Sequence, residues 1–442
     1  MAVAGTTMKT LHWQGRIGIT HAENEVALMS RACFVGFALL ALVGRTSADQ
    51  WPGWRGPRGD GTSTESNIPI HWSATENIVW KVPIPGKGHS SPIVWDDRIF
   101  ITTCLEQDGK RLLLCLHRVS GKMLWQREVL TALLERKHSL NSFASATPAT
   151  DGKHVWVAFL QEPTMEVACY DFDGNKIWQR SPGEFHSIHG FCSSPVLYKD
   201  RVILNGDQDA EAWIVALDKS TGAERWRADR PNRTRSYCTP ILIEAAGRTQ
   251  LVLSGSKSVA SYDPDTGKQI WIIDGPTEQF VSSLVFTQNV LFLTGGFPTY
   301  HLMGIRPDGE GNVSHSHVLW HDRRAANYVP SPIAQGKYFF FVNDNGTGAG
   351  CIDAKTGDRL WTERLGRHHS ASPVSAEGRL YFLDDDGNMS VVRAAPQFEL
   401  VSKNPLGEEC RASPAISNGQ IFIRTLHHLY CIGKSEPVSQ GQ

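Results

Sequence analysis

The chain has 442 residues, a formal net charge of −1 and 41% hydrophobic residues, which is an ordinary balance for a globular protein. Because basic residues are not in excess, nucleic acid is not expected as a bulk partner. The 40 glycines, 23 prolines and 14 tryptophans favour an all-β chain that is rich in turns and anchored by aromatic side chains.

The first 48 residues are predicted to be a secretory signal. Arg31 precedes the apolar run 32–44, and the small residues 46–48 follow it, which is the order of charge, hydrophobic region and cleavage site. The apolar run is too short to stay in a bilayer as a helix, so we expect no transmembrane helix after cleavage. The mature protein is therefore predicted to be periplasmic or secreted, and Met29 stands where a start would give a leader of ordinary length.

A Ser/Thr-Pro pair followed by a β-type run recurs along the chain about every 40 to 55 residues. Each copy reads as a strand, a polar turn and a second strand, as in "SSPVLYKDRVIL". In one copy Leu284 stands where the proline is expected. The eight copies occupy 90–101, 146–159, 193–204, 238–243, 281–293, 330–341, 371–383 and 412–423.

A second signal, typified by "TGAERW" ending at Trp226, follows most of these copies. It reads as a glycine turn and then a strand whose tryptophan offers a large flat face to a neighbour. The other copies end at Trp125, Trp178, Trp271, Trp320 and Trp361, with an insertion before Trp320. The two signals together give four strands per repeat, which is the content of a β-propeller blade.

The last repeat stops at 429–433 without a fourth strand, whereas "ENIVWKV", 76–82, precedes the first repeat and lacks a repeat of its own. We therefore predict an all-β, eight-bladed propeller over 76–434 that this N-terminal strand closes, which removes free sheet edges. Residues 49–75 are then an N-terminal extension, and 435–442 a tail.

The unit "ALDKSTGAERW", 216–226, resembles the tryptophan-docking motif of the eight-bladed quinoprotein alcohol dehydrogenase-like superfamily, the PQQ-like repeat. The resemblance extends over about 77–433, and "WPGWRGPRGDG", 51–61, is similar to the mature N-terminus of exported bacterial PQQ-like propeller proteins. It implies one of two functions. Some relatives oxidise alcohols or sugars with pyrroloquinoline quinone and calcium, and others, including the outer-membrane protein assembly scaffold, are non-catalytic docking rings.

The resemblance implies, for a dehydrogenase of alcohols, a vicinal Cys-Cys disulfide over the quinone and an Asp base. The sequence has no Cys-Cys pair and no aspartate that we can match to the base, which favours a binding or scaffold protein. Sugar-oxidising relatives lack some of these features too, so a quinoprotein oxidoreductase stays the alternative. Its candidate proton acceptors are Glu408 and Glu409, the carboxylates close to the start of an inner strand.

The residues just before the inner strands are expected to surround one mouth of the propeller channel. A ring of cations and aromatic side chains there suits an anionic or carbohydrate ligand, or a partner protein of a monomeric propeller; an ordinary water-filled mouth is the alternative. The charge also suits the quinone, which is a tricarboxylate. The candidate ligand-binding residues are His89, His189, Arg235, Tyr237, Phe280, Tyr328, His369 and Arg411.

The long loop 126–145 carries apolar residues at 129, 130, 133 and 134, a helical spacing. We expect this loop to cover the mouth or to meet a partner.

Most cysteines are expected to serve as small buried residues, because four of them occupy the first position of the docking motif. Cys104 and Cys115 flank a hairpin and can bridge, and Cys192 and Cys238 start neighbouring inner strands and can also bridge. The stretch "DDDGN", 384–388, resembles the first part of a calcium loop, but its place in the repeat predicts a hairpin turn.

Overall fold

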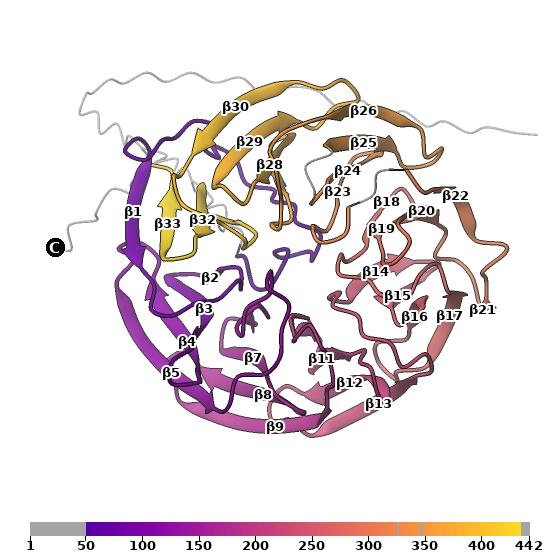
Figure 1. Ribbon diagram of the computed structural model, residues 1–442, viewed down its shortest axis with the longest axis horizontal. Helices are drawn as coiled ribbons and strands as arrows, with labels where there is room; N and C mark the ends of the chain where they lie inside the picture. Colours follow the sequence, from indigo (N-terminus) through magenta and orange to yellow (C-terminus); the bar gives the residue numbers. More distant parts are fainter. Residues whose placement is uncertain (1–49, 325–326, 345–347, 435–442) are drawn as a thin grey trace, which may run out of the picture. The chain divides into compact units, whose positions relative to one another are not determined.

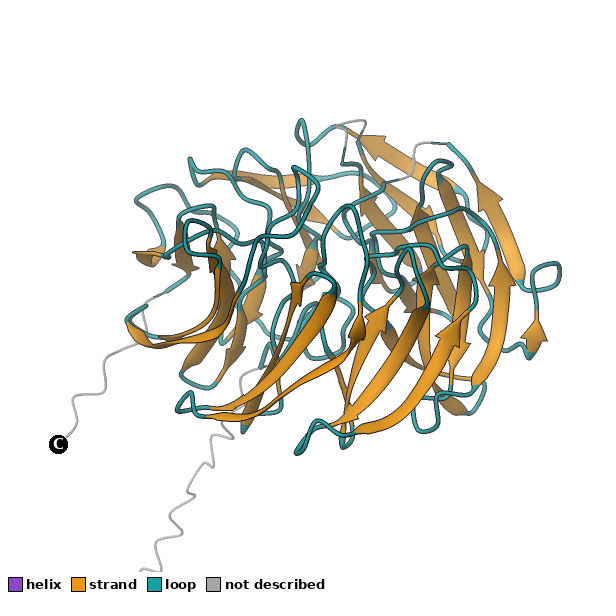
Figure 2. Cartoon of the chain, turned by 60° about the horizontal axis from the view of Figure 1, so that its bottom comes forward, coloured by secondary structure: helices purple, strands orange, loops and turns teal. Residues whose placement is uncertain are grey.

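The computed structural model describes residues 50–324, 327–344 and 348–434; the predicted signal segment 1–48 and tail 435–442 lie outside the described residues. The described chain folds into strands and loops, without a helix (Figure 2). Accordingly, this part of the chain contains no helix long and apolar enough to cross a membrane.

Eight antiparallel sheets form a ring, and in each the chain runs from the axis to the rim (Figure 1). Blade 1 comprises β2 (Ile93–Trp95), β3 (Arg98–Leu105), β4 (Lys110–His117) and β5 (Met123–Thr131). Blade 2 comprises β6 (Ala149–Thr150), β7 (His154–Gln161), β8 (Thr164–Asp171) and β9 (Lys176–Glu184). Blade 3 comprises β10 (Val196–Tyr198), β11 (Arg201–Gly206), β12 (Ala212–Asp218) and β13 (Glu224–Arg230). Blade 4 comprises β14 (Ile241–Ala245), β15 (Arg248–Gly255), β16 (Ser258–Tyr262) and β17 (Gln269–Asp274).

The second half of the ring repeats this order. Blade 5 comprises β18 (Val285–Thr287), β19 (Val290–Gly295), β20 (His301–Ile305) and β22 (Val318–Asp322). Blade 6 comprises β23 (Ile333–Gln335), β24 (Tyr338–Val342), β25 (Ala349–Asp353) and β26 (Arg359–Glu363). Blade 7 comprises β27 (Val374–Ala376), β28 (Arg379–Leu383), β29 (Asn388–Arg393) and β30 (Leu400–Pro405). Blade 8 comprises β31 (Ala415–Ser417), β32 (Gln420–Arg424), β33 (His428–Ile432) and, from the other end of the chain, β1 (Ile78–Pro83).

The predicted closure of the ring is confirmed. Strand β1 pairs antiparallel with β33, and Trp80 lies opposite Cys431. The outer strand of blade 8 therefore comes from the start of the propeller, so both ends of the described ring are held in one sheet.

The tryptophan motif works by contact between neighbouring blades. Trp178 donates its indole N–H to the carbonyl of Lys219 at 2.8 Å, and a Cβ at Gly222 would lie 2.7 Å from its ring. Gly222 has φ of +71°, so glycine both permits the turn and lets the indole approach the backbone. The same contact joins Trp80 to Gly121, Trp125 to Gly174, Trp226 to Gly267 and Trp320 to Gly357.

The junction after blade 4 departs from this pattern because of the insertion before Trp320. Trp271 is fully buried and donates its indole N–H to the side chain of Gln250 within its own blade, at 2.8 Å. The inserted segment adds the short strand β21 (Gly311–Asn312), which pairs in parallel with β17 as a fifth strand.

The Ser/Thr of each Ser/Thr-Pro pair links adjacent blades close to the axis. Its hydroxyl oxygen accepts the backbone N–H of the equivalent residue in the preceding blade, as when Ser194 accepts the N–H of Thr147 at 3.0 Å. At the junction of blades 8 and 1, Arg424 reaches across to the Ser90 hydroxyl at 2.8 Å and the Thr102 carbonyl at 2.6 Å. Seven hydroxyl links of 2.8–3.0 Å run from Ser91 through Thr147, Ser194, Thr239, Ser283, Ser331 and Ser372 to Ser413.

The N-terminal extension crosses the middle of the ring, where Figure 1 shows it in indigo. Trp51 is 1% exposed and pairs with Val94 of blade 1. Arg55 is also buried and donates to the carbonyls of Pro332 and Pro373, at 2.6 Å each, where the inner strands of blades 6 and 7 begin. The extension therefore joins blades on opposite sides of the ring and closes one end of the channel.

One expectation is wrong, and two are confirmed. The loop 126–145 is not helical, since β5 runs on to Thr131 and the rest is irregular, so the apolar spacing reflects a strand that buries Val129 and Leu130. The cysteines of the described residues are free thiols and all but Cys192 are buried, as expected for packing residues; the alternative bridges are not formed, and across the β3–β4 hairpin Cys104 pairs with Arg111 rather than with Cys115. The stretch 384–388 is the predicted hairpin turn between β28 and β29.

Candidate functional site

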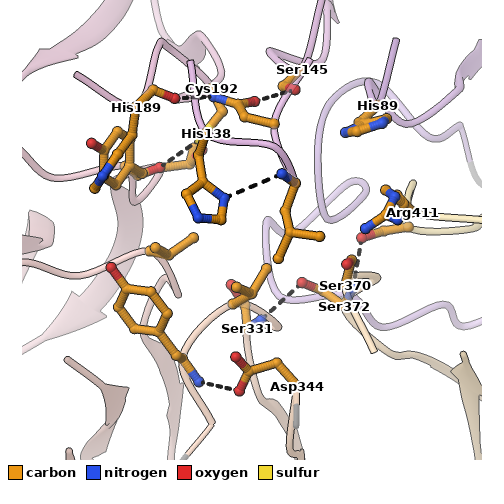
Figure 3. A pocket seen from close by; sticks show the side chains of 18 of the residues that line it. His89, His138, Ser145, His189, Cys192, Ser331, Asp344, Ser370, Ser372 and Arg411 are labelled. Carbon is orange, nitrogen blue, oxygen red and sulfur yellow. Dashed lines mark hydrogen bonds between the residues drawn. The ribbon is translucent and has the colours of Figure 1, made fainter. Parts of the chain in front are cut away.

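A cavity of about 620 Å³ occupies the channel at the end where the inner strands begin. Residues that precede the inner strands of all eight blades line its wall, and Trp54 of the N-terminal extension lies among them. Figure 3 shows His89, His138, His189, Asp344 and Arg411 around this hollow. The channel is thus open on one side and closed by the chain's own extension on the other.

The structure brings most of the predicted mouth residues together. His369 and Phe280 are the exceptions, because both side chains are buried and lie outside the cavity lining. The residues that line the cavity as expected are His89, His189, Arg235, Tyr237, Tyr328 and Arg411.

Both arginines of the cavity are already paired with carboxylates. Arg235 donates to Asp209 at 2.7 Å, and Arg411 donates to Glu409 at 3.0 Å and to Asp385 at 3.2 Å. An anionic ligand would have to compete with these carboxylates. The mouth is therefore less cationic than its sequence suggests.

The two predicted histidines are held in their neutral form. Burial, reinforced by the charges of Arg424 and Arg411, lowers the pKa of His89 to about 3. Burial and the nearby Arg235 also lower the pKa of His189. Near neutral pH these imidazoles offer hydrogen bonds and flat faces, and no positive charge.

One side of the cavity is aromatic. The Tyr237 hydroxyl lies 2.9 Å from that of Ser187, and the Tyr328 hydroxyl accepts from the Gln279 side chain at 2.6 Å. Burial raises the pKa of Tyr328 to about 12, so the phenol stays protonated. Tyr300 meets the Tyr328 ring edge-on, with centroids 6.4 Å apart. This side offers ring faces and neutral hydroxyls.

The candidate proton acceptors lie outside the cavity. Glu408 and Glu409 line a separate hollow of about 470 Å³, which shares only Leu140 and Arg411 with the axial cavity. Burial acts to raise the pKa of Glu408, but hydrogen bonds from Thr425, His427 and His428 outweigh it, and the pKa is below its usual value. A carboxylate held in this way is a weak base.

Several lining residues were not singled out from the sequence. His138, Leu140 and Asn141 reach the cavity from the loop after β5, and Trp54 reaches it from the extension. The repeated Ser/Thr before the proline supplies seven further lining residues. Its recurrence directly before the inner strands could have identified these residues as cavity lining from the sequence. Asp344 occupies the same place in its repeat as Asp207 and Asp385 do in blades 3 and 7, so a recurring carboxylate was the available signal.

The cofactor and metal that the fold implies do not fit these residues. The quinone's carboxylates need cations that no protein carboxylate already holds, and Arg235 and Arg411 are paired. Calcium needs several oxygen ligands, whereas Asp344 is the one carboxylate in the lining and its burial raises its pKa. In the described segments no group of three or more His, Cys, Asp or Glu could hold a metal.

Comparison with known proteins agrees with the geometry. BamB from Moraxella catarrhalis superposes with a TM-score of 0.57 at 11% identity, over 81% of this chain and 98% of that chain. Quinohemoprotein alcohol dehydrogenase from Comamonas testosteroni superposes with a TM-score of 0.63 at 12% identity, over 89% of this chain and 82% of that chain. At such identities the likeness shows the shared fold alone.

Curated proteins give no match to the chain. The family described as outer membrane protein assembly factor BamB, in contrast, matches residues 109–363 and 347–433. Since these ranges include most of the propeller, the chain belongs to the family of outer membrane protein assembly factor BamB.

Proposed function

We propose that the protein is a binding or scaffold protein of the cell envelope that engages a partner protein at the open mouth of its channel. The observation that carries this proposal is Leu133, whose side chain is 94% exposed on the loop after β5. Around the same mouth lie further exposed apolar residues, namely Leu134, Leu140, Ile188, Phe297 and Tyr300.

Most of the other exposed large apolar side chains have a different arrangement. Four of the six, Leu124, Ile177, Leu319 and Leu360, each stand directly before a docked tryptophan, so they are spread one per blade along the outer strands. Isolated apolar residues of this kind are normal on a protein surface, whereas a group around a concave site is typical of binding surfaces.

Membership of the BamB family supports docking, since that family is described as an assembly factor. The predicted signal 1–48, with a start at residue 1 or at Met29, places the mature chain in the envelope. We propose that it works there as a monomer, with the described part of the extension, 50–75, at the closed end of the channel and 76–434 forming the ring.

A double substitution tests this proposal more cleanly than deletion of the loop. A deletion of 128–140 would remove buried Val129 and Leu130, and also Glu135, which forms a buried ion pair with Arg111. Changing Leu133 and Leu134 to serine leaves those buried residues in place, and the matched control changes Leu319 and Leu360, which are about as exposed as Leu134, to serine.

Cross-linking in intact cells followed by purification measures the outcome. The Leu133/Leu134 variant should lose its cross-linked complex while the control keeps it, and the purified partner should bind the wild type and the control alone. Thermal midpoints should change little, because the altered side chains are exposed. Equal yields of complex from all three proteins would contradict the proposal.

The alternative, a quinone-dependent oxidoreductase of alcohols or sugars, has the support of the fold. Titration of the purified protein with pyrroloquinoline quinone and calcium separates the two functions. Stoichiometric binding with dye reduction, lost when Arg235 and Arg411 are both changed to alanine, would establish the enzyme. Absence of binding at tens of micromolar would leave the binding protein.

A further inference from the structure

The hydroxyl groups of the inter-blade links have hydrogen-bonding capacity left over. Seven of the eight oxygens, all but that of Ser91, accept one backbone N–H, but among the described residues none of the eight hydroxyls donates to a protein acceptor. Ser283 is the one member outside the cavity lining. The seven that line it are Ser91, Thr147, Ser194, Thr239, Ser331, Ser372 and Ser413.

A serine or threonine hydroxyl has one donor and two lone pairs, so each of these groups can still donate once and accept once. All seven are less than 9% exposed, and a buried donor without an acceptor is costly. The wall of the cavity therefore favours an occupant that carries both acceptors and donors at many positions.

The charges in the wall argue against an anion. Arg235 and Arg411 are held by Asp209, Asp385 and Glu409. An anionic occupant would face these carboxylates as well as the arginines. The neutral state of His89 adds no attraction near neutral pH.

The aromatic side provides the other half of the recognition. Trp54, Tyr237, Tyr300 and Tyr328 line the cavity and offer flat apolar faces beside the hydroxyl groups. A sugar ring has apolar C–H faces and hydroxyls around its edge, which both donate and accept. Aromatic faces within a ring of hydroxyls are therefore complementary to it.

We propose that the axial cavity binds an uncharged saccharide, with a ring face against the tyrosines and its hydroxyls on the Ser/Thr ring. The volume of about 620 Å³ lies within the range of small-ligand pockets. The site borders the apolar rim at Leu140, Phe297 and Tyr300, but none of the seven hydroxyl residues belongs to that rim.

Saturation-transfer NMR and titration with defined probes test the ligand class. The probes are cellobiose, maltose and N,N′-diacetylchitobiose, each paired with a disaccharide that carries a uronic acid in place of one sugar. At least one neutral probe should bind with a Kd of about 1 mM or tighter, and at least tenfold more tightly than its acidic counterpart. Absence of binding by every neutral probe at about 10 mM, or equal or tighter binding of the acids, would overturn the proposal.

A matched pair of ring variants tests the site itself. Ser372→Ala and Ser283→Ala each remove the acceptor of one inter-blade bond, from Ser331 and Thr239 respectively, both at 2.9 Å. Only Ser372 lines the cavity. Ser372→Ala should weaken binding of the best neutral probe about three- to tenfold, and Ser283→Ala should leave it within about twofold. Equal affinities in the two variants would contradict the assignment.

Two further variants separate this inference from partner docking. Tyr328→Ala, at a lining residue that is not part of the apolar rim, should weaken saccharide binding, whereas Tyr338→Ala on β24 outside the cavity should not. The Leu133/Leu134 double serine variant should bind the saccharide as well as the wild type does. If that variant loses the saccharide while Tyr328→Ala retains it, the ligand sits on the rim and the proposed site is wrong.

Discussion

The two ends of the channel use arginine in opposite ways. At the closed end, Arg55 is 3% exposed and donates to three backbone carbonyls, those of Asp60, Pro332 and Pro373. Burial lowers its pKa to about 10. At the open end, Arg411 is partly exposed and lies between the carboxylates of Glu409 and Asp385.

The same eight inner strands frame both ends, so the difference comes from what covers them. At the closed end the extension satisfies the strands with its own donors, and little is left for a ligand. At the open end the loops pair their charges with one another and leave the Ser/Thr hydroxyls without protein acceptors. The closed end and the open end therefore differ more in the number of hydrogen-bonding groups left without a protein partner than in net charge.

The largest effect on this contrast is expected from Trp51, which packs fully buried in the closed end. Trp51→Ala should lower the free energy of unfolding by about 4 kcal/mol through the cavity it leaves. Trp54→Ala, three residues further along and only partly buried, is the control and should cost about 1 kcal/mol or less. Chemical denaturation measures the free energy of unfolding of both variants. Equal losses would contradict the larger contribution expected from the buried Trp51.

Arg55→Leu should have the next largest effect, about 3 kcal/mol, because it leaves buried carbonyls of two blades without a donor. Arg55→Lys should recover only part of this, since an ammonium lacks the planar fork that reaches both carbonyls. Arg58→Leu, at an exposed position, is the control, and thermal unfolding ranks the stabilities of the three variants. If Arg55→Leu were as stable as the wild type, the contact of the extension with blades 6 and 7 would not stabilise the ring.

His89 at the open end should make the free energy of unfolding depend on pH. The pKa of His89 is about 3 in the fold against 6.5 for an ordinary histidine, so between these values the unfolded chain binds a proton that the folded chain does not. Stability should therefore rise with pH across this window and be lost as pH falls. Between pH 7 and pH 5 the wild type should lose about 2 kcal/mol more than His89→Gln. Parallel profiles from urea titrations would contradict a buried neutral His89.

The smallest effect is expected from Arg411→Ala. Its ion pairs are partly exposed, and such pairs contribute about 1 kcal/mol or less to stability. The thermal midpoint should shift far less than for Arg55→Leu. A comparable loss of stability in Arg411→Ala and Arg55→Leu would show that the two arginines contribute equally to the fold, which would contradict the comparison of the two ends.

The repeat made the ring predictable because each signal has a local cause. Trp178 and Gly222 recur in register since an indole can approach only a glycine turn, and the Ser/Thr-Pro pairs mark the inner strands. The closing strand was predictable because the last repeat lacks a fourth strand, whereas residues 76–82 form a strand without a repeat of its own. The helical spacing inferred for the loop 126–145 was wrong because Val129 and Leu130 are buried at the end of an extended strand. A short apolar run is compatible with either a strand or a helix, so the sequence could not distinguish them.

The candidate site was predictable in its residues but less so in its chemistry. His89, Arg235 and Arg411 were placed at the mouth by their position before inner strands, and they line the cavity. Asp209 and Asp385 lie on other loops, distant in sequence from Arg235 and Arg411, so these two pairings could not be read from the chain. His369 stands one position earlier in its repeat than His89 and Arg411 do, and its side chain is buried outside the lining, where Ser370 takes the matching place.

The sequence by itself determined the number of blades, the docking of every repeat tryptophan but Trp271 and the closure by residues 76–82, because these depend on motifs repeated in register. Only the tertiary structure decided that residues 51–72 close the channel and that the arginines of the mouth are neutralised. It also revealed the free hydroxyls of the Ser/Thr ring. These features depend on contacts between segments that share no motif, and they exist only once the ring brings opposite blades around one axis.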